Sequence, residues 1–502
     1  MTLHHVAPSS EVDHSFSAIA PSALQAAVYE NVARGIGHTL VSARAGCGKT
    51  TTIMGALKSV SRGCTVALFA FNNSIKQELA ARVAKQNLKN VEVKTLHAHG
   101  FAACRRAFPG CTLNDDKSLL LCEDLFGEPI RNHPLRGRYR AIQKLVSKAK
   151  DVRIHKGDLD ALDMLVDTFD IDCPEDIETR GEFVAMAMKV LARSAQVTSI
   201  VDFSDMCWLP VVLNLRIWTF DRVFVDETQD LSPCQIELLL RSVKPGGRIC
   251  AVGDERQAIY AFRGADVHTI PNLIKVLKAT VLPLSVTYRC ARAIVQLANI
   301  EVPDLQAADD APEGYIGDCW LDAALTQAAP GDMIISRSNA PLLGACLKLL
   351  ASGKRAAIKG RDVGAGIVRL IDKSKATTVD ALLEWLDRWH AKETARLVKD
   401  DRPTDEIDDK VECIRVLTEG VETVVAVRLR AETLFADDGG DAGRITLGTT
   451  HRLKGLEADR VWMLADTYRR ESGGEESNVW YVAITRAKTT LMMVRTRQQD
   501  DS

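Results

Sequence analysis

Short apolar, β-branched runs alternate with longer stretches of helical character along most of the chain. A first series of runs spans residues 39–43, 65–71, 91–96, 222–227 and 248–254, and a second spans 332–338, 444–451 and 460–466. Short apolar strands that alternate with helices are typical of parallel sheets covered by helices. The two series therefore predict an α/β protein with two parallel-sheet domains.

Two stretches interrupt these series. Residues 105–195 are helical in pattern, rich in charge and without a strand signal, and residues 361–440 include a solvated, charged stretch with one proline at 393–412. We expect both to be helical insertions that emerge from the sheet domains. The predicted division is a first sheet domain over 1–104 and 196–278 and a second over 279–360 and 441–502, with insertions at 105–195 and 361–440.

Composition narrows the class of protein. A chain of 502 residues is too long for one hydrophobic core. No apolar run approaches the roughly 20 residues that a membrane span needs, and residues 1–16 do not have a signal-peptide pattern. The 13 cysteines are scattered singly, which argues against zinc or iron–sulfur ligation and for reduced thiols. We therefore expect a soluble, cytoplasmic protein. Its net charge of −2 gives no global attraction to polyanions.

The stretch "VSARAGCGKTTT" at 41–52 carries the first chemical signal. A glycine-rich turn between a strand and a helix directs several backbone N–H groups, and the positive end of the helix dipole, at one point. We expect Lys49 to reach the terminal phosphates of a nucleotide and the Thr50 hydroxyl to bind Mg²⁺. The pattern has alanine at its first glycine position. The expected phosphate-binding residues are Ala43, Arg44, Ala45, Gly46, Cys47, Gly48, Lys49, Thr50 and Thr51.

Two further apolar runs end in polar side chains that suit the same site. "VFVDETQD" at 223–230 places Asp226 and Glu227 at the carboxyl end of a strand, where open parallel sheets bind ligands. We expect Asp226 to hold Mg²⁺ through its hydration shell and Glu227 to orient and deprotonate the attacking water. In "AVGDERQAIYAFRGA" at 251–265, Gln257 is placed to contact the γ-phosphate.

The end of that last block offers a candidate contact for a nucleic acid. Tyr260, Phe262 and Arg263 follow one another closely on a predicted loop beside the ATP site. Two aromatic rings and an arginine suit stacking on bases and pairing with a phosphodiester. For Phe262, packing in the core is an equally good interpretation, because buried phenylalanines are common.

Nine sequence blocks in a fixed order carry a family resemblance. They are "SARAGCGKT", "FAFNNSIKQEL", "VKTLHAHGF", "DETQD", "GDERQAIYAFRGA", "LSVTYRC", "SRSNA", "TTHRLKGLE" and "YVAITRAK". With them the chain resembles the UvrD/Rep-type superfamily 1 DNA helicases over about 21–496, in a compact form like phage-encoded members and the helicase part of the F-box DNA helicases. The resemblance implies two P-loop, RecA-like domains that use ATP and Mg²⁺.

The resemblance also implies roles for residues outside the phosphate loop. Gln25 matches the glutamine that reads adenine, although it also fits a helix capping box with the serine three residues before it, and both interpretations stay open. Tyr288 matches the aromatic that stacks on adenine, and Glu457 the residue near the ribose. Arg289 matches the arginine on the γ-phosphate and Arg486 the arginine finger, roles that suit a rigid fork of donors.

On the DNA side, the resemblance implies contacts from both sheet domains. His97 and His99 also fit a structural role, because no metal-like spacing surrounds them. The residues that match DNA-contacting positions are Phe71, Asn72, Thr95, His97, Thr449 and His451, beside Tyr260, Phe262 and Arg263.

The expected function is an ATP-dependent motor that moves on single-stranded DNA and unwinds duplex. The alternative, which needs the same motifs, is an ATP-switched DNA clamp or remodeller that displaces bound proteins without processive unwinding. A 3′→5′ direction follows from the resemblance alone. The expected partners are single-stranded DNA and single/double-strand junctions but no membrane, and we expect a monomeric motor in a bacterial or phage-infected cell. The pathway, whether repair, recombination control or phage replication, stays open.

Residues 131–156 form a basic segment with nine Lys/Arg and one acidic residue, Asp151. Such a run is often a solvated helical face. Its one-sided charge, and Tyr139 among Arg136, Arg138 and Arg140, instead predict a grip on the DNA backbone with a stacking plane beside it.

Overall fold

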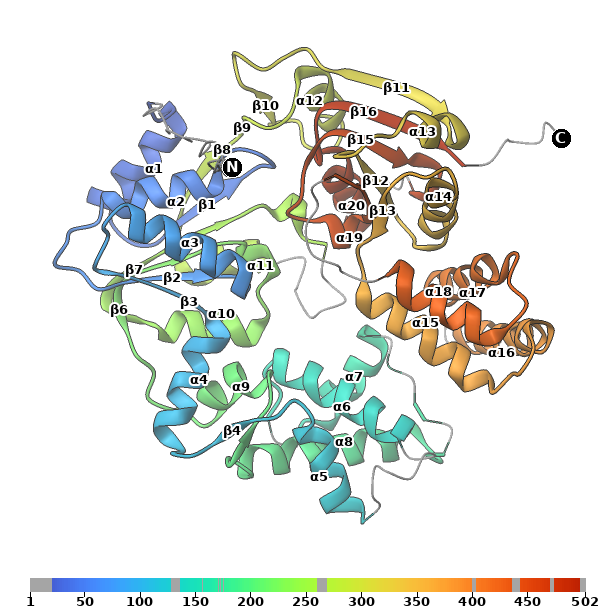
Figure 1. Cartoon of the computed structure of the whole chain (residues 1–502). Helices are drawn as coiled ribbons and strands as arrows, with labels where there is room; N and C mark the ends of the chain where they lie inside the picture. Colours follow the sequence, from blue (N-terminus) through green and yellow to red (C-terminus); the bar gives the residue numbers. More distant parts are fainter. Residues whose placement is uncertain are drawn as a thin grey trace, which may run out of the picture.

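The chain folds into two six-stranded parallel sheets, each surrounded by helices, and two separate groups of helices (Figure 1). The computed structural model describes residues 20–127, 136–155, 157–169, 171, 173–174, 176–259, 269–399, 403–435, 443–469 and 474–496, without the side chains of Arg136 and Asp362. No helix in this part of the chain is long and apolar enough to cross a membrane. The predicted α/β class with two parallel-sheet domains is confirmed.

The first sheet has the strand order β3-β2-β6-β7-β1-β8, and every neighbouring pair is parallel. Its strands are β1 (Thr39–Ala43), β2 (Val66–Ala70), β3 (Val91–Thr95), β6 (Phe220–Val225), β7 (Val243–Gly253) and β8 (Thr280–Leu284). The five runs of the first predicted series all form strands here. β8 pairs with β1, so the first sheet continues past the predicted domain boundary at residue 278.

The second sheet has the order β11-β16-β15-β12-β14-β13 and is also parallel throughout. Its strands are β11 (Tyr315–Trp320), β12 (Met333–Ser336), β13 (Ala356–Ile358), β14 (Ile445–Thr449), β15 (Ala458–Leu464) and β16 (Ala487–Arg495). A two-residue parallel pair, β9 (Val286–Thr287) with β10 (Gln306–Ala307), lies between the two sheets in sequence. The three runs of the second predicted series form β12, β14 and β15.

Helices cover both sheets, because each crossover between parallel strands needs one. Around the first sheet lie α1 (Ala23–Arg34), α2 (Lys49–Lys58), α3 (Asn73–Lys85), α4 (Leu96–Ala107), α9 (Asp205–Val212), α10 (Pro233–Arg241) and α11 (Thr269–Leu277). Around the second lie α12 (Arg292–Ala298), α13 (Leu321–Gln327), α14 (Ala340–Ala351), α19 (Thr450–Leu453) and α20 (Gly474–Ile484). Short 3₁₀ turns follow β6, β7 and β15 at Thr228–Asp230, Glu255–Gln257 and Ala465–Thr467.

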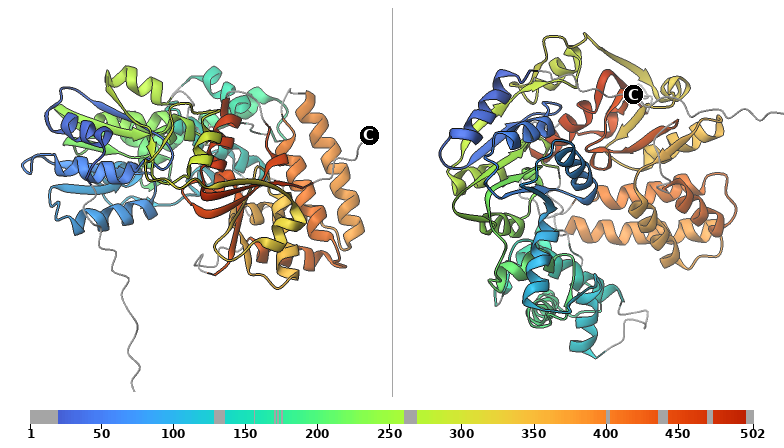
Figure 2. Two further views of the ribbon diagram at one scale, coloured as in Figure 1. Left: turned by 90° about the horizontal axis from the view of Figure 1, so that it is seen from above. Right: turned by 60° about the vertical axis from the view of Figure 1, so that its left-hand side comes forward.

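The two helical groups extend from the same side of the sheet domains (Figures 1 and 2). The first contains α5 (Lys117–Phe126), α6 (Arg136–Asp151), α7 (Leu159–Thr168) and α8 (Arg180–Gln196), and the second contains α15 (Arg361–Ser374), α16 (Val379–Lys399), α17 (Asp405–Thr418) and α18 (Val424–Leu434). One detail differs from the expectation of no strand over 105–195. A two-residue strand, β4 (Thr112–Leu113), pairs with β5 (Ile200–Val201).

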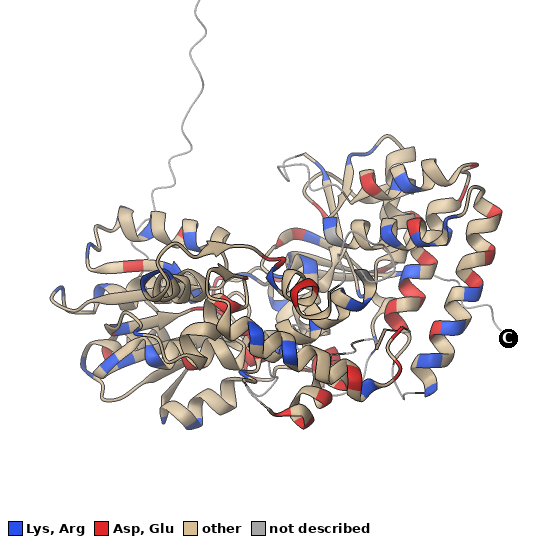
Figure 3. Ribbon diagram, turned by 90° about the horizontal axis from the view of Figure 1, so that it is seen from below, with Lys and Arg blue, Asp and Glu red and all other residues tan. Residues whose placement is uncertain are grey.

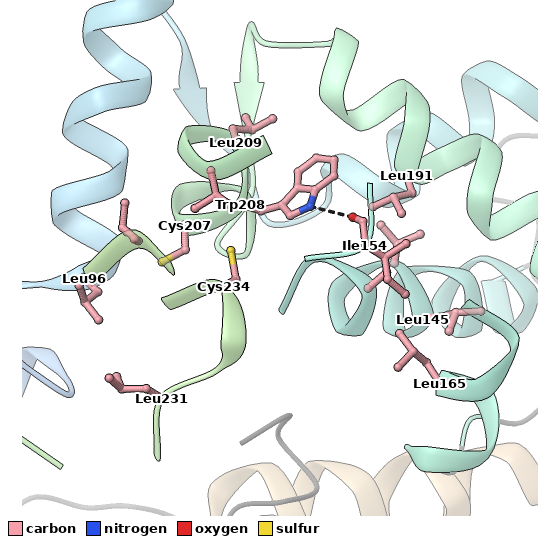
Figure 4. Packing of buried hydrophobic residues seen from close by; sticks show 14 of the residues in the cluster. Leu96, Leu145, Ile154, Leu165, Leu191, Cys207, Trp208, Leu209, Leu231 and Cys234 are labelled. Atoms are coloured by element: carbon pink, nitrogen blue, oxygen red, sulfur yellow. Dashed lines mark hydrogen bonds between the residues drawn. The ribbon is translucent and has the colours of Figure 1, made fainter. Parts of the chain in front are cut away.

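The first helical group shares one hydrophobic core with the first sheet. Trp208 on α9 is fully buried, and its Nε1 donates to the Ile154 carbonyl oxygen at 3.0 Å (Figure 4). Leu145 and Leu191 from the helical group belong to the same buried cluster as Leu231 beside the first sheet. The helical group is therefore packed onto the first sheet domain rather than tethered by a loose linker.

The basic segment at 131–156 is largely built into this packing. Tyr139 is fully buried in the shared core, with its ring 6.2 Å from that of Phe126. Ion pairs join Arg138 to Asp176, Lys150 to Asp202 and Asp205, and Arg153 to Glu237. The expectation that Tyr139 offers a stacking plane to DNA is wrong, because the ring faces the helical core. DNA binding by the exposed part of the segment, which includes Arg140, stays a prediction.

Positions of opposite charge are interspersed along the ribbon in the view from below (Figure 3). Lys and Arg positions lie among Asp and Glu positions both on the helical groups and on the sheet domains in this view. This distribution agrees with the net charge of −2. Any binding of a polyanion must then come from local clusters of cations rather than from the overall field.

Candidate ATP site and nucleic-acid contacts

The glycine-rich loop joins β1 to α2 at the carboxyl edge of the first sheet. Gly46 and Gly48 have φ angles of 71° and 77°, which favour glycine. A side chain at position 46 would collide with Thr287 and with Arg289, so the loop approaches the 287–289 segment as only glycine allows. Gly48 is the N-cap residue of α2, so the free N–H groups of its first turn lie at the loop.

This loop forms one wall of a cavity of about 680 Å³ between the two sheet domains. Residues of the first sheet domain line one side of the cavity, and Arg289 and other residues of the second sheet domain line the opposite side. The lining residues are Gly46, Cys47, Gly48, Lys49, Thr50, Thr51, Phe71, Asn72, Ile75, Glu78, Arg82, Asp226, Glu227, Asp230, Gln257, Tyr288, Arg289, Lys454, Gly455, Glu457, Arg486 and Lys488. The cavity therefore brings together candidates from seven of the nine sequence blocks.

Lys49 and Glu227 form an ion pair in the wall of this cavity. The Lys49 ammonium lies 2.8 Å from both carboxylate oxygens of Glu227, and Gln229 Nε2 donates to Glu227 Oε2 at 2.5 Å. Burial opposes ionisation of Glu227, but the ammonium groups of Lys49 and Lys454 outweigh it and keep its pKa below the ordinary value. Glu227 is therefore held as a carboxylate at neutral pH.

Asp226 has the opposite environment, although it is the neighbour of Glu227 in sequence. Its side chain is buried, and its Oδ1 accepts from the Glu227 N–H at 2.9 Å. Burial, and then the Glu227 carboxylate, raise the pKa of Asp226 above its ordinary value. A buried carboxylate suits a divalent metal ion, and Thr50 lines the same cavity.

The second sheet domain contributes a group of charged side chains to the cavity. Arg289 Nε lies 2.5 Å from Glu457 Oε2, and Lys488 Nζ lies 3.1 Å from Glu457 Oε1. Arg486 is only 1% exposed and donates to the carbonyl oxygens of Val482 and Leu456 at 2.9 and 3.1 Å. Burial, and then Arg289, lower the pKa of Arg486 to about 10, so it remains charged at neutral pH.

Lys454 connects the two domains at the cavity wall. Its Nζ donates to the two carboxylate oxygens of Asp230 at 2.9 and 2.6 Å and to the Gln257 carbonyl oxygen at 2.8 Å. Gln257 itself donates from Nε2 to Asp254 Oδ2 at 2.8 Å. Sequence reasoning missed Lys454 and Asp230, although both lie inside the blocks "TTHRLKGLE" and "DETQD". Nothing in one sequence shows that these two blocks meet.

Several predicted nucleotide-binding residues lie behind the cavity wall. Ala43, Arg44, Ala45 and Gln25 are not among the residues that line it. The Gln25 side chain forms the capping box of α1, as one of the two interpretations predicts, and Nε2 donates to Thr52 Oγ1 at 3.3 Å. Its contact with adenine stays a prediction. Tyr288 does line the cavity, and 54% of its surface is exposed, as a stacking plane requires.

Cys47 lies in the loop but is not a reactive thiol. It is 1% exposed, and burial raises its pKa to about 12. Because the thiolate is the nucleophilic form, this cysteine is inert at neutral pH. All 13 cysteines of the chain are free thiols in the structure, as their scattered positions predict.

The predicted DNA-contacting residues fall into different settings. Asn72 caps α3 by accepting from the Ile75 N–H at 2.9 Å, and Thr95 caps α4 in the same way through the Ala98 N–H at 3.1 Å. Phe71 lines the cavity beside Asn72. Thr449 is mostly buried at the end of β14. Their DNA contacts stay predictions, and Tyr260, Phe262 and Arg263 lie outside the described residues.

His97 and His451 are neutral rings rather than cations. Burial lowers the pKa of His97 to about 4, and burial, followed by Arg337, lowers that of His451 to about 4. The His97 ring stacks on Phe203 with centroids 3.9 Å apart and planes 23° apart. Phe203 is 54% exposed and escaped the sequence analysis, because a single aromatic outside a quoted block gives no signal. His99 is buried against Phe69, as the structural interpretation predicts.

Comparison with known proteins assigns the chain to a family. Residues 24–278 match the UvrD/REP helicase N-terminal domain, and residues 347–498 match the UvrD-like helicase C-terminal domain. The chain belongs to the UvrD/Rep helicase family. The predicted family resemblance is thereby confirmed, and the two six-stranded sheets fit two RecA-like domains of this family.

Individual relatives of the UvrD/Rep family are similar at low identity. The chain is 25% identical over 289 residues to the ATP-dependent DNA helicase Rep of Escherichia coli, covering 53% of this chain and 41% of that protein. It is 26% identical over 333 residues to the ATP-dependent DNA helicase UvrD1 of Mycobacterium leprae (58% and 40%), and 27% identical over 312 residues to F-box DNA helicase protein 1 of Schizosaccharomyces pombe (55% and 34%). The chain thus matches between about one third and two fifths of the length of these relatives.

Proposed function

We propose that this protein is an ATP-dependent DNA helicase that hydrolyses ATP between its two sheet domains and moves along single-stranded DNA. The observation that carries the proposal is the shared cavity, in which Lys49 and Glu227 of the first sheet domain face Arg289 and Arg486. A phosphate cradle on one domain and two arginines on the other suit a nucleotide whose terminal phosphate lies between them. The relatives named DNA helicases support DNA as the track.

The proposed chemistry begins with an exchange of partners at Lys49. When ATP binds, the Lys49 ammonium leaves Glu227 for the terminal phosphates. Glu227 then loses one of the two cations that keep its pKa low and becomes a better base for the attacking water. Arg289 and Arg486 stabilise the charge that develops on the transferred phosphoryl group. The Gln257 side chain contacts the γ-phosphate. Its backbone carbonyl oxygen accepts from Lys454 and so connects this contact to the second domain.

The donor set of the cavity fits Mg²⁺. Thr50 supplies a hydroxyl and Asp226 a buried carboxylate, and hard oxygen donors of this kind are those that Mg²⁺ prefers. When bound, the ion would neutralise charge on the phosphates. Tyr288, Glu457 and Gln25 are proposed to hold the adenosine end of ATP, as the family resemblance implies.

The proposed DNA surface combines both sheet domains. Phe71, Asn72, Thr95 and His97 come from the first, with Tyr260, Phe262 and Arg263, and Thr449 and His451 come from the second. Because His97 and His451 are neutral, they would act as stacking or hydrogen-bonding rings rather than as partners of phosphate charge. Exposed Phe203, stacked on His97, adds a further plane for a base.

We propose that the motor works as a monomer with 3′→5′ direction on single-stranded DNA and single/double-strand junctions in the cytoplasm. In this arrangement the domains are 1–104 with 196–284 and 285–360 with 441–502, and the helical insertions are 105–195 and 361–440. The revised boundary at 284 keeps β8 with its partner β1. Closure of the cavity on ATP and its opening after hydrolysis would move the two DNA-contacting surfaces relative to each other.

The direct test is steady-state ATP hydrolysis with and without single-stranded DNA. We expect DNA to stimulate turnover in the wild type, and Glu227→Gln to abolish turnover while ATP still binds, because the amide keeps the shape and loses the base. Lys49→Ala should lose both ATP turnover and ATP binding. Glu432→Gln, which changes an exposed glutamate on α18, is the matched control and should behave as wild type.

Near-wild-type turnover in Glu227→Gln would contradict the assignment of the base. DNA-stimulated hydrolysis without strand separation would instead support the ATP-switched clamp or remodeller. Unwinding of a tailed duplex, measured beside hydrolysis in the same preparation, separates these two outcomes.

A further inference from the structure

Arg44 lies in the glycine-rich loop, yet its side chain is directed away from the nucleotide cavity. Arg44 is 8% exposed, and its Nε donates to both carboxylate oxygens of Asp304 at 3.0 Å. A second contact joins Nη2 to Asp304 at 2.9 Å, and Nη1 donates to Asp254 Oδ1 at 3.3 Å. This fork therefore connects the phosphate-binding loop to two carboxylates that lie outside the loop.

Asp304 is carried by the second sheet domain. It lies between Val302 and Leu305, which are 1% exposed and belong to the same hydrophobic core as Val461 of β15 and Leu491 of β16. The Asp304 side chain itself remains 52% exposed. A movement of the second domain therefore moves the carboxylate that holds Arg44.

A second, independent contact fixes the next residue of the loop to the same domain. The Ala45 N–H donates to the Tyr481 hydroxyl oxygen at 2.9 Å, and both residues are fully buried. Tyr481 lies on α20, five positions before Arg486 at the cavity. Ala45 also packs within the core of the second domain, although β1 ends only two residues before it.

Hydrogen bonds continue from Arg44 to the groups around the γ-phosphate position. Asp254, which accepts from Arg44, also accepts from Gln257 Nε2 at 2.8 Å, and its own N–H donates to Gln229 Oε1 at 3.0 Å. Gln229 donates in turn to Glu227. Asp254 is completely buried, so a shift of Arg44 cannot be absorbed by water at this point.

We propose that Arg44 is a positioning residue whose ion pair with Asp304 makes the geometry of the phosphate-binding loop depend on the position of the second sheet domain. The Tyr481–Ala45 contact is the second anchor of the same connection. The inference rests on the proposed function, because it assigns a coupling role at the same ATP site. DNA that moves the second domain would in this way change the affinity of the loop for nucleotide.

The test measures this coupling directly. The coupling factor is the Kd of a fluorescent, non-hydrolysable ATP analogue without oligo(dT) divided by its Kd with saturating oligo(dT). Asp304→Asn should reduce the factor by about two- to fivefold, the range that a half-exposed ion pair supports. Because coupling is reciprocal, the effect of saturating analogue on the Kd of oligo(dT) should fall by the same factor. Local damage to the loop would weaken analogue binding equally with and without DNA and leave the factor unchanged.

Three further variants make the result decisive. Asp304→Glu should restore most of the coupling, and Tyr481→Phe, which removes the oxygen that accepts from Ala45, should lower it even if Asp304→Asn folds poorly. Asp387→Asn breaks an exposed pair with Arg415 in the second helical group and should leave the factor unchanged.

Wild-type coupling in both Asp304→Asn and Tyr481→Phe would overturn the inference and leave the proposed function intact. A wild-type protein that binds the analogue or oligo(dT) without any coupling would overturn both.

Discussion

Glu227 takes a left-handed backbone conformation, with φ of 51°, two residues after the end of β6. For a residue with a side chain this conformation costs of the order of 1–3 kcal/mol and persists where the surroundings fix it. Here the Lys49 ion pair and the Gln229 hydrogen bond hold the carboxylate at the cavity wall. The strain therefore coincides with the residue to which the proposed function assigns the base.

Arg486 gives a prediction at the same scale. Its guanidinium is fixed by backbone carbonyls and reaches the cavity from the second domain, so it suits transition-state charge better than ground-state binding. Arg486→Ala should lower turnover by about 10³-fold with a much smaller loss of ATP affinity. Single-turnover hydrolysis, beside equilibrium binding of an ATP analogue, measures the two effects separately.

Arg486→Lys is the matched variant, because it keeps the charge but loses the rigid fork of donors. It should recover only part of the turnover. If Arg486→Ala weakened ATP binding and kept its turnover, the residue would act in the ground state instead.

At the scale of elements, α6 shows that packing buries part of a segment whose sequence is basic. Tyr139 is completely buried in the core that the first helical group shares with the first sheet domain. Tyr139→Ala should therefore lower the free energy of unfolding by about 3–5 kcal/mol, the usual cost of removing a buried aromatic ring. Urea unfolding followed by circular dichroism measures this loss.

Arg140→Ala is the control on the same helix, because that side chain is exposed and should change stability little. Binding of Arg140→Ala to oligo(dT) at several salt concentrations tests the remaining prediction of a DNA grip. The slope of log affinity against log salt should fall by roughly 0.7 for one lost phosphate contact on a single strand. A Tyr139→Ala variant that folds normally but binds DNA poorly would restore the stacking interpretation.

At the scale of the whole molecule, the two sheet domains meet around the cavity through Lys454, Tyr481 and Asn478. The Asn478 amide donates to the carbonyl oxygens of Glu255 and Ala258 at 3.3 and 3.1 Å, so α20 contacts the first domain at several points. A change in the cavity can therefore alter the position of one sheet domain relative to the other. The proposed stepping along a DNA strand needs a relative movement of this kind.

Direction of movement is the prediction that belongs to the whole molecule. Because the chain belongs to the UvrD/Rep family, we expect unwinding to need a 3′ single-stranded tail. Duplexes with a 3′ tail, a 5′ tail or blunt ends, each mixed with ATP and the protein, measure this by strand release. Efficient unwinding from the 5′ tail alone would place the motor in the opposite direction.

Of the four strands of the two large sheets that the sequence missed, three share a physical reason. β8, β11 and β13 lie at sheet edges, where one side of the strand has no partner and the apolar pattern weakens. β8 also contains Pro283. Proline is tolerated in an edge strand, but in a sequence it argues against the prediction of a strand. β16 is an interior strand, but partly buried and exposed residues separate its buried ones, and two threonines interrupt its apolar pattern.

The sequence by itself determined the family and the eight apolar strands. It also identified Lys49, Asp226 and Glu227 as candidate site residues. These inferences depend on local pattern and residue type. Only the tertiary structure decided the direction of side chains whose partners lie far away along the chain. Arg44 belongs to a phosphate-binding motif but is held by Asp304, 260 positions later, and Tyr139 belongs to a basic run but is buried in a core. Burial and long-range pairing depend on how elements pack, and a single sequence without homologues does not encode that packing in any local pattern.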